Sequence, residues 1–270
     1  MQKNWVETSW GRVGYMRSGG RGPVVVLLHS NSTSGEIFSR QFAGLGKRFS
    51  LVAVDLPGHG RSANLQEPFS YGLVSMAAVV GVALDRLGIN DPLMVGTSLG
   101  GHVVLEMMRH RHMAGAMLVG TPPYAPDPAR IGEAYRPDPV AALSFVAELS
   151  PQQVADFADA LSDGHPDTNL WRRAIMRTDP NMRLHLAAGL FDPEAGDQRQ
   201  LAENSAVPLA IVNGAEDRFV DLDYVDSLAY ANLWSGRTYR IAGAGHAPFV
   251  SKPEAFNTIL NRMVEDVFGA

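Results

Sequence analysis

A serine between two glycines, in the string GTSLG at residues 96–100, is well placed to act as a nucleophile. The apolar run 93–95 precedes this string and the apolar run 102–108 follows it. Strand, sharp turn and helix are the context that a G-x-S-x-G nucleophile elbow requires, and its glycines are needed because the turn is strained and crowded. We therefore predict that Ser98 is a nucleophile at the carboxyl end of a buried strand.

A serine hydroxyl needs a general base, and the base needs a carboxylate that orients it. After such an elbow the acid comes next along the chain and the histidine last. Asp217 follows the apolar run 207–212, and His246 follows a predicted strand at 237–241. The sequence thus predicts a triad of Ser98, Asp217 and His246.

Glu216 is the rival acid of this triad, because it stands next to Asp217. Successive side chains leaving a strand point to opposite sides, so only one of these two carboxylates should face His246. We favour Asp217 and keep Glu216 as the alternative.

A carbonyl under attack by the serine needs two hydrogen-bond donors for its developing oxyanion. The backbone N–H of Leu99, directly after the nucleophile, is one expected donor. The N–H of Asn31, in the loop after the apolar run 24–28, is the other. Because loss of one such donor costs about 2.7–4 kcal/mol, this loop matters as much as the triad.

The composition excludes several other chemistries. The chain has no cysteine, which removes thiolate nucleophiles and every cysteine-based metal site. Neither H-E-x-x-H nor H-x-H-x-D-H occurs, so we expect no metal and no other cofactor. With 23 basic and 28 acidic residues the net charge is −5, which gives nucleic acid no basic surface to bind. We expect a small-molecule substrate, and the sequence leaves the oligomeric state open.

Short apolar runs alternate with helical patterns along the chain, which predicts a mostly parallel, doubly wound α/β sheet. A predicted helix at 71–87 stops at Gly88, and Ser251 with Glu254 could form a capping box for the last helix. The predicted strands are 24–28, 51–54, 92–95, 116–119, 207–212 and 237–241.

A proline-rich region interrupts this alternation between residues 121 and 206. It shows helical patterns at 140–149 and 151–161 and no strand. We interpret it as a helical cap, or lid, inserted into one core made of residues 1–120 and 207–270. The 270-residue length suits one α/β domain that carries such an insertion.

The polar N-terminus and the short apolar stretches argue against export and membrane insertion. The longest near-apolar stretch, 76–84, is far below the roughly 20 residues that span a bilayer. We expect a cytoplasmic protein without a membrane partner.

With these residues placed, the chain resembles the α/β-hydrolase superfamily over nearly its whole length. DLPGHGRS at 55–62 is similar to the loop after that family's fourth strand, and GAGH at 243–246 to its histidine loop. Finer strings resemble the α/β-hydrolase type of N-acyl-homoserine lactone lactonase: LHSNSTSG at 28–35, GTPP at 120–123, NLWSG at 232–236 and GHAPF at 245–249.

This resemblance implies a metal-independent, quorum-quenching hydrolase that opens the homoserine lactone ring through an acyl-enzyme intermediate. Two positions depart from the family pattern. Ser30 follows His29 where the family usually has glycine, and the acid matched to Asp217 can be glutamate. Aromatic and aliphatic side chains of the cap and nearby loops are expected to line an acyl-chain pocket: Tyr124, Phe157, Leu161, Trp171, Phe219 and Trp234.

Two alternative functions stay open. The same triad would serve a carboxylesterase or a hydrolase of carbon–carbon bonds, because these enzymes differ in the pocket and not in the triad. A non-enzymatic receptor for a small ligand could also be built on this scaffold, although it would not need all three triad residues.

Overall fold

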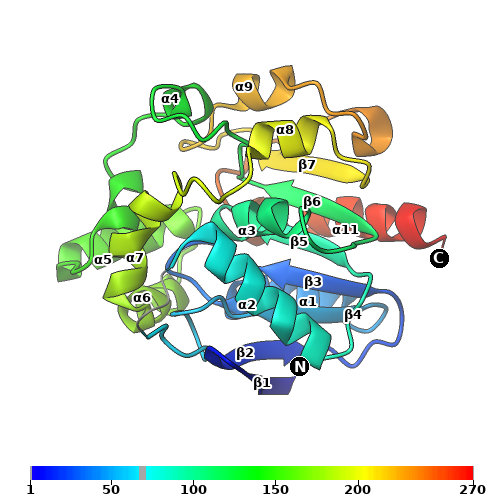
Figure 1. Cartoon of the computed structure of the whole chain (residues 1–270), viewed down its shortest axis with the longest axis horizontal. Helices are drawn as coiled ribbons and strands as arrows, with labels where there is room; N and C mark the ends of the chain where they lie inside the picture. Colours follow the sequence, from blue (N-terminus) through cyan, green and yellow to red (C-terminus); the bar gives the residue numbers. More distant parts are fainter. Residues whose placement is uncertain (1, 67–70, 270) are drawn as a thin grey trace.

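The computed structural model describes residues 2–66 and 71–269, and its centre is a sheet. Within this part of the chain, eight strands lie in the order β1-β2-β4-β3-β5-β6-β7-β8 (Figure 1). β1 and β2 are antiparallel, as are β2 and β4, and the remaining pairs are parallel. The strands are β1 (Gln2–Thr8), β2 (Gly11–Arg17), β3 (Val24–Leu28), β4 (Ser50–Val54), β5 (Leu93–Thr97), β6 (Gly115–Val119), β7 (Leu209–Gly214) and β8 (Tyr239–Ile241).

The predicted α/β fold with a mostly parallel, doubly wound sheet is confirmed, and each predicted strand is present with small shifts at its ends. The N-terminal strands β1 and β2 were not predicted. β1 lies at the edge of the sheet and is largely exposed, with Trp5 at 57% exposure. An edge strand with little buried surface lacks the apolar run that identified the others.

Alternate side chains of the central strands pack on opposite faces of the sheet. Val26 packs in the cluster that holds α2 (Leu73–Arg86) and α3 (Leu99–Met107). Val25 packs in the cluster that holds α1 (Ser39–Leu45) and α11 (Pro253–Phe268). Burial on both faces explains why these strands are continuous apolar runs. The connections also hold short helices, among them η1 (Gly35–Phe38), α9 (Leu222–Ser227) and η3 (Trp234–Gly236).

The predicted capping box of the last helix is wrong. Ser251 is the last residue of a separate short helix, α10 (Pro248–Ser251), and its hydroxyl donates to the Ala247 carbonyl at 3.3 Å. Lys252 precedes α11 without a side-chain cap, and the helix begins at Pro253. Proline at the first helical position lacks an N–H that would otherwise need a partner, so the helix starts there without the box.

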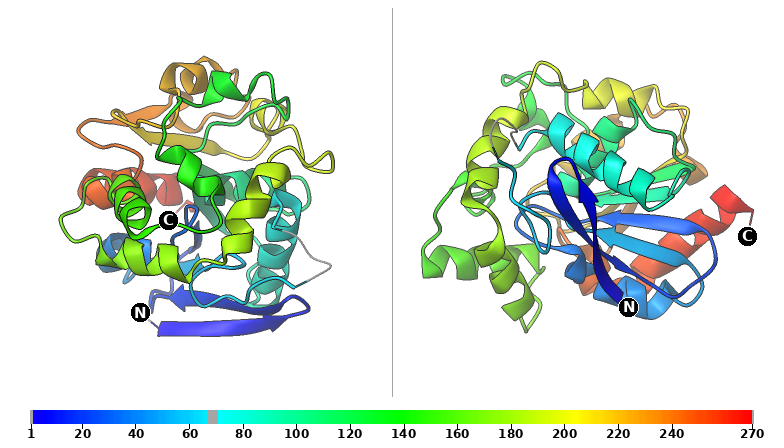
Figure 2. Two further views of the ribbon diagram at one scale, coloured as in Figure 1. Left: turned by 90° about the vertical axis from the view of Figure 1, so that its left-hand side faces the viewer. Right: turned by 60° about the horizontal axis from the view of Figure 1, so that its bottom comes forward.

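Residues 121–206 contribute short helices that approach the carboxyl ends of the strands. α5, α6 and α7 lie beside those ends, whereas α8 packs next to α3 (Figures 1 and 2). The helices are α4 (Ile131–Ala134), η2 (Ala141–Phe145), α5 (Pro151–Leu161), α6 (Asn169–Arg177), α7 (Pro180–Gly189) and α8 (Gln198–Glu203). The division into core and cap at residues 120 and 206 stays a prediction.

The predicted helix at 140–149 is reduced to the short 3-10 helix η2. Beyond it, Val146 has extended backbone. The guanidinium of the buried Arg183 donates hydrogen bonds to the carbonyl oxygens of Val146 and Ala147 at 2.8 and 2.7 Å. Because a tertiary partner takes these carbonyls, the segment satisfies its backbone without helical hydrogen bonds.

No helix among residues 2–66 and 71–269 combines the length and the apolar character needed to cross a bilayer.

Candidate active site

Ser98 stands at a sharp turn between β5 and α3. Its backbone angles, φ 50° and ψ −118°, are unusual for a residue with a side chain. A Cβ added to Gly96 would lie 2.4 Å from the carbonyl oxygen of Gly100. A Cβ added to Gly100 would lie 2.3 Å from the carbonyl oxygen of Leu28. The turn therefore has the strain and close packing of a nucleophile elbow, as the GTSLG string predicts.

His246 is hydrogen-bonded to Asp217 and not to Glu216. Nδ1 of His246 lies 2.8 Å from Oδ2 of Asp217. The other carboxylate oxygen accepts the N–H groups of Phe219 and Val220 at 2.9 and 3.2 Å. Asp217 is 1% exposed, whereas Glu216 is exposed to solvent. Of the two neighbouring carboxylates, the turn after β7 brings only Asp217 to the histidine.

Burial and charge compete at this pair. Burial disfavours the charged forms, which would lower the pKa of His246 and raise that of Asp217. Each residue's charge and hydrogen bond favour ionisation of the other, so the pKa of His246 is raised and the pKa of Asp217 is lowered. The carboxylate of Asp163 adds to the raised pKa of His246. A base with a raised pKa binds a proton readily, which suits a general base opposite a serine.

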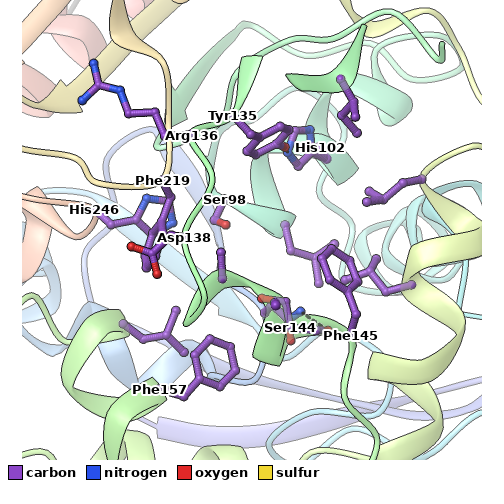
Figure 3. Close-up of a pocket in the computed structure, with 18 residues that line it drawn as sticks. Ser98, His102, Tyr135, Arg136, Asp138, Ser144, Phe145, Phe157, Phe219 and His246 are labelled. Atoms are coloured by element: carbon purple, nitrogen blue, oxygen red, sulfur yellow. Dashed lines mark hydrogen bonds between the residues drawn. The ribbon is translucent and has the colours of Figure 1, made fainter. Parts of the chain in front are cut away.

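Ser98 and His246 open into a cavity of about 330 Å³. Figure 3 shows Ser98 between His246 with Phe219 on one side and Tyr135 with His102 on the other. Among the described residues no hydrogen bond joins Ser98 to His246; such catalytic bonds often tighten only when substrate binds. Most of the remaining wall is apolar and comes from residues 131–190, including Ala141, Phe145, Leu186 and Leu190.

The two predicted oxyanion donors border this cavity. Asn31 and Leu99 both line it, and neither backbone N–H donates to another residue in the part of the chain that the structure describes. Two free N–H groups beside the serine are what a developing oxyanion needs.

The loop that carries Asn31 is fixed by contacts on several sides. The Asn31 side chain donates to the Ser144 carbonyl of η2 at 3.1 Å. The N–H of Ser32 donates to Nε2 of the buried His59, and the Ser32 hydroxyl donates to the Asn31 amide oxygen. Ser30, the residue that departs from the family pattern, places its hydroxyl 2.9 Å from that of Thr97. The extra hydroxyl thus connects the loop to the end of β5, directly before Ser98.

The six predicted pocket residues divide into two groups. Phe157, Leu161 and Phe219 line the cavity. Tyr124, Trp171 and Trp234 are buried but do not belong to its lining. The indole N–H of Trp234 donates to Asp266 on α11 at 3.0 Å, and Trp171 packs against His165.

His102 and Tyr135 also line the cavity, although sequence analysis did not select either of them. His102 Nδ1 lies 2.6 Å from the Gln198 side-chain oxygen, and its Nε2 lies 2.6 Å from the Tyr135 hydroxyl. Burial lowers the pKa of His102 to about 4, so its ring is neutral near pH 7. The signal available in the sequence is spacing, since His102 follows Ser98 by one helical turn.

Residues 2–66 and 71–269 contain no group of three or more histidine and carboxylate side chains arranged to hold a metal ion.

Comparisons with known proteins show the family to which this fold belongs. The family described as alpha/beta hydrolase fold matches residues 23–253. A curated relative, the pimeloyl-[acyl-carrier protein] methyl ester esterase of Methylococcus capsulatus, is 29% identical over 265 residues, covering 93% of this chain and 98% of the relative.

Two solved structures of the N-acyl homoserine lactonase AidH are also similar. A mutant complexed with N-hexanoyl homoserine lactone superposes with a TM-score of 0.95 at 34% identity, covering 99% of this chain and 98% of the other. The complex with N-butanoyl homoserine has the same TM-score at 35% identity, covering 99% and 97%.

This chain belongs to the α/β-hydrolase family, as the family match over residues 23–253 and the fold both show. Within that family it is a serine hydrolase of the esterase and lactonase type.

Proposed function

We propose that this hydrolase opens the lactone ring of N-acyl-homoserine lactones. The observation that carries the proposal is the likeness to AidH, at 34–35% identity over 99% of the chain with a TM-score of 0.95. The curated esterase relatives are less similar, at 26–29% identity. An apolar wall beside Ser98 also suits a substrate that has an acyl chain next to its reactive carbonyl.

In the proposed mechanism His246, oriented by Asp217, removes the proton of Ser98 as the serine oxygen attacks the lactone carbonyl. The N–H groups of Leu99 and Asn31 stabilise the tetrahedral oxyanion. When the ring C–O bond breaks, His246 returns its proton to the leaving alkoxide. The acyl-enzyme is then a serine ester of N-acyl-homoserine with a free terminal hydroxyl.

Water completes the cycle. His246 removes a proton from water, the hydroxide attacks the ester carbonyl, and Ser98 leaves with the proton from His246. The product is N-acyl-homoserine with a free carboxylate, one water heavier than the lactone. No step requires a metal or another cofactor.

We propose further that residues 121–206 act as a cap that encloses the acyl chain. Phe157 and Leu161 of α5 and Leu186 of α7 present apolar side chains to the cavity that contains Ser98. Burial of a chain against them would contribute about 0.8 kcal/mol for each methylene group.

Carboxylesterase activity is the second candidate, favoured by the methyl ester esterase names of the curated relatives. Its acyl-enzyme chemistry would be the same, with methanol in place of the tethered alcohol as leaving group. The two functions differ in whether the pocket prefers a cyclic or an open ester.

The deciding experiment measures kcat/KM for N-hexanoyl homoserine lactone and for an open methyl ester of equal acyl length, with product masses. We expect a ring-opened product one water heavier than the lactone, a higher kcat/KM for the lactone, and loss of both activities in Ser98→Ala. Buffer without protein controls for spontaneous lactone opening. An intact lactone with rapid ester turnover would identify an esterase, and release of free homoserine lactone would identify an acylase.

A further inference from the structure

Asp163 connects the 121–206 segment to the loop that carries His246. It lies just beyond α5 in left-handed backbone conformation, with φ 57°. Its Oδ2 accepts the backbone N–H of Gly245 at 2.7 Å, across 82 positions of sequence. Gly245 immediately precedes His246, so this hydrogen bond acts on the backbone that directs the imidazole.

Gly245 is enclosed on two sides. A Cβ on Gly245 would lie 2.1 Å from Oδ1 of Asp163. On the other side, a Cβ on Gly214, at the end of β7, would lie 2.0 Å from the Gly245 carbonyl oxygen. The peptide before the histidine is therefore packed between the Asp163 carboxylate and the strand that leads to Asp217.

We propose that Asp163 is a positioning residue for His246, which it serves by hydrogen-bonding the histidine loop and by holding a second negative charge beside the ring. The inference rests on the proposed role of His246 as the general base. Asp163 touches no reacting atom in this scheme. It acts through its hydrogen bond to Gly245 and through the electrostatic effect of its negative charge on His246.

Asp217, Asp163 and His102 act electrostatically on the imidazole. Asp138 also lines the cavity, but its carboxylate pairs with Arg218 at 2.7 Å. Asp217 comes from the turn after β7, Asp163 from the end of α5, and His102 from α3. His102 is neutral near pH 7, so the two carboxylates supply the charge that the imidazolium meets. Burial alone would lower the pKa of His246, and the charge of Asp163 joins that of Asp217 in raising it.

The position of Asp163, two residues beyond the end of α5, links two parts of the site. The same helix carries Phe157 and Leu161, which line the cavity. The apolar wall and the histidine loop are therefore joined by one side chain.

Two substitutions separate the hydrogen bond from the charge. Asp163→Asn keeps an oxygen acceptor and tolerates the left-handed backbone, but removes the charge. Asp163→Gly removes the acceptor and the charge without backbone strain. Asp159→Asn is the matched control, because Asp159 is exposed on the same helix and its side chain makes no hydrogen bond to the histidine loop in the described structure.

The measurement is kcat and KM against pH for a short-chain p-nitrophenyl ester, with thermal unfolding to confirm folding. In Asp163→Asn we expect the ascending limb of kcat/KM to move by about half a pH unit toward acid, with the plateau within about twofold of wild type. Asp163→Gly should show the same shift and a kcat about tenfold lower at unchanged KM. Asp159→Asn should match wild type.

The outcomes separate this inference from the proposed function. If Ser98→Ala retains turnover, the proposed function is wrong and this inference fails with it. If Ser98→Ala is inactive while both Asp163 variants match wild type in pH profile and kcat, the inference alone is wrong. A limb that moves equally in Asp159→Asn would also overturn it, because any lost carboxylate would then have the same effect.

Discussion

The ring of His246 packs directly on the α-carbon of Gly120. A Cβ added there would lie 2.7 Å from Cε1 and 2.9 Å from Nδ1 of the imidazole. Gly120 directly follows β6 and has φ 56°, and its N–H donates to the side-chain oxygen of Asn213 at 2.8 Å. Phe219 meets the ring edge-on, with centroids 4.9 Å apart. Strand ends distant in sequence therefore set the orientation of the proposed base.

Gly120→Ala should displace the imidazole and impair chemistry more than binding. We expect kcat to fall about 10- to 100-fold at nearly unchanged KM, because a misplacement of about 1 Å can cost a hundredfold in rate. Steady-state kinetics on an ester substrate measure this. Gly132→Ala is the control, since a Cβ there meets nothing within 4 Å. Equal kcat values for the two variants would contradict the packing argument.

Ser98→Gly should make the protein more stable while it abolishes hydrolysis. Glycine adopts a φ of 50° without the strain that serine carries there, which is worth about 1–3 kcal/mol. For a domain of this size that corresponds to a rise of roughly 2–12 °C in the unfolding midpoint. Calorimetry and ester turnover test both halves. A midpoint at or below that of wild type would show that the elbow is not strained.

The activity should follow the neutral form of His246. Its pKa is raised above the ordinary 6.5, so kcat/KM should rise with pH and reach half its maximum above pH 6.5. Asp217→Asn removes the charge and the carboxylate hydrogen bond, so only the charge of Asp163 is left to oppose burial and the pKa of His246 should fall. The limb should therefore move toward acid while the plateau falls about 10³–10⁴-fold, since the imidazole loses its orientation.

Glu216→Gln is the matched control for that experiment, because it removes a neighbouring carboxylate that is exposed. Its pH profile should equal that of wild type. A large loss in Glu216→Gln with little loss in Asp217→Asn would reverse the assignment of the acid.

Stability should fall in acid because His102 is buried in its neutral form. Its pKa is about 4 in the folded protein and 6.5 in the ordinary state. Between pH 6.5 and pH 4 the unfolded chain protonates His102 and the folded chain does not, which favours unfolding. The stability advantage of the neutral His102 is therefore complete above pH 6.5 and is lost as the pH falls to 4. At about 1.4 kcal/mol per pH unit the loss is roughly 3 kcal/mol.

His102→Gln should remove this part of the acid sensitivity, measured as the difference in urea unfolding free energy between pH 7.5 and 4.5. His29 and His59 also have lowered pKa values, and their contribution stays in both proteins. His112→Gln serves as control, because the His112 side chain is 85% exposed. Identical pH dependence in wild type and His102→Gln would contradict the burial argument.

Local patterns predicted the elements that bury their side chains. Strands β4, β5 and β6 are buried along their whole length, so their apolar runs identify them. GTSLG describes a turn whose geometry depends on its own glycines. The exposed strand β1 and the interrupted helix at 140–149 were not predictable in this way. The first lacks an apolar run, and the second is interrupted because its carbonyls bind Arg183, which lies 36 or 37 positions away.

The sequence by itself determined the α/β class, the elbow at Ser98 and the order of serine, acid and histidine, because each depends on neighbouring residues or on their succession. Only the tertiary structure decided that Asp217, and not Glu216, meets His246, that Asp163 reaches Gly245, and that His102 borders the cavity. These contacts join loops 29 and 82 positions apart. Sequence periodicity does not predict such contacts between distant loops, because they form where the packed strands bring their carboxyl ends to one edge of the sheet.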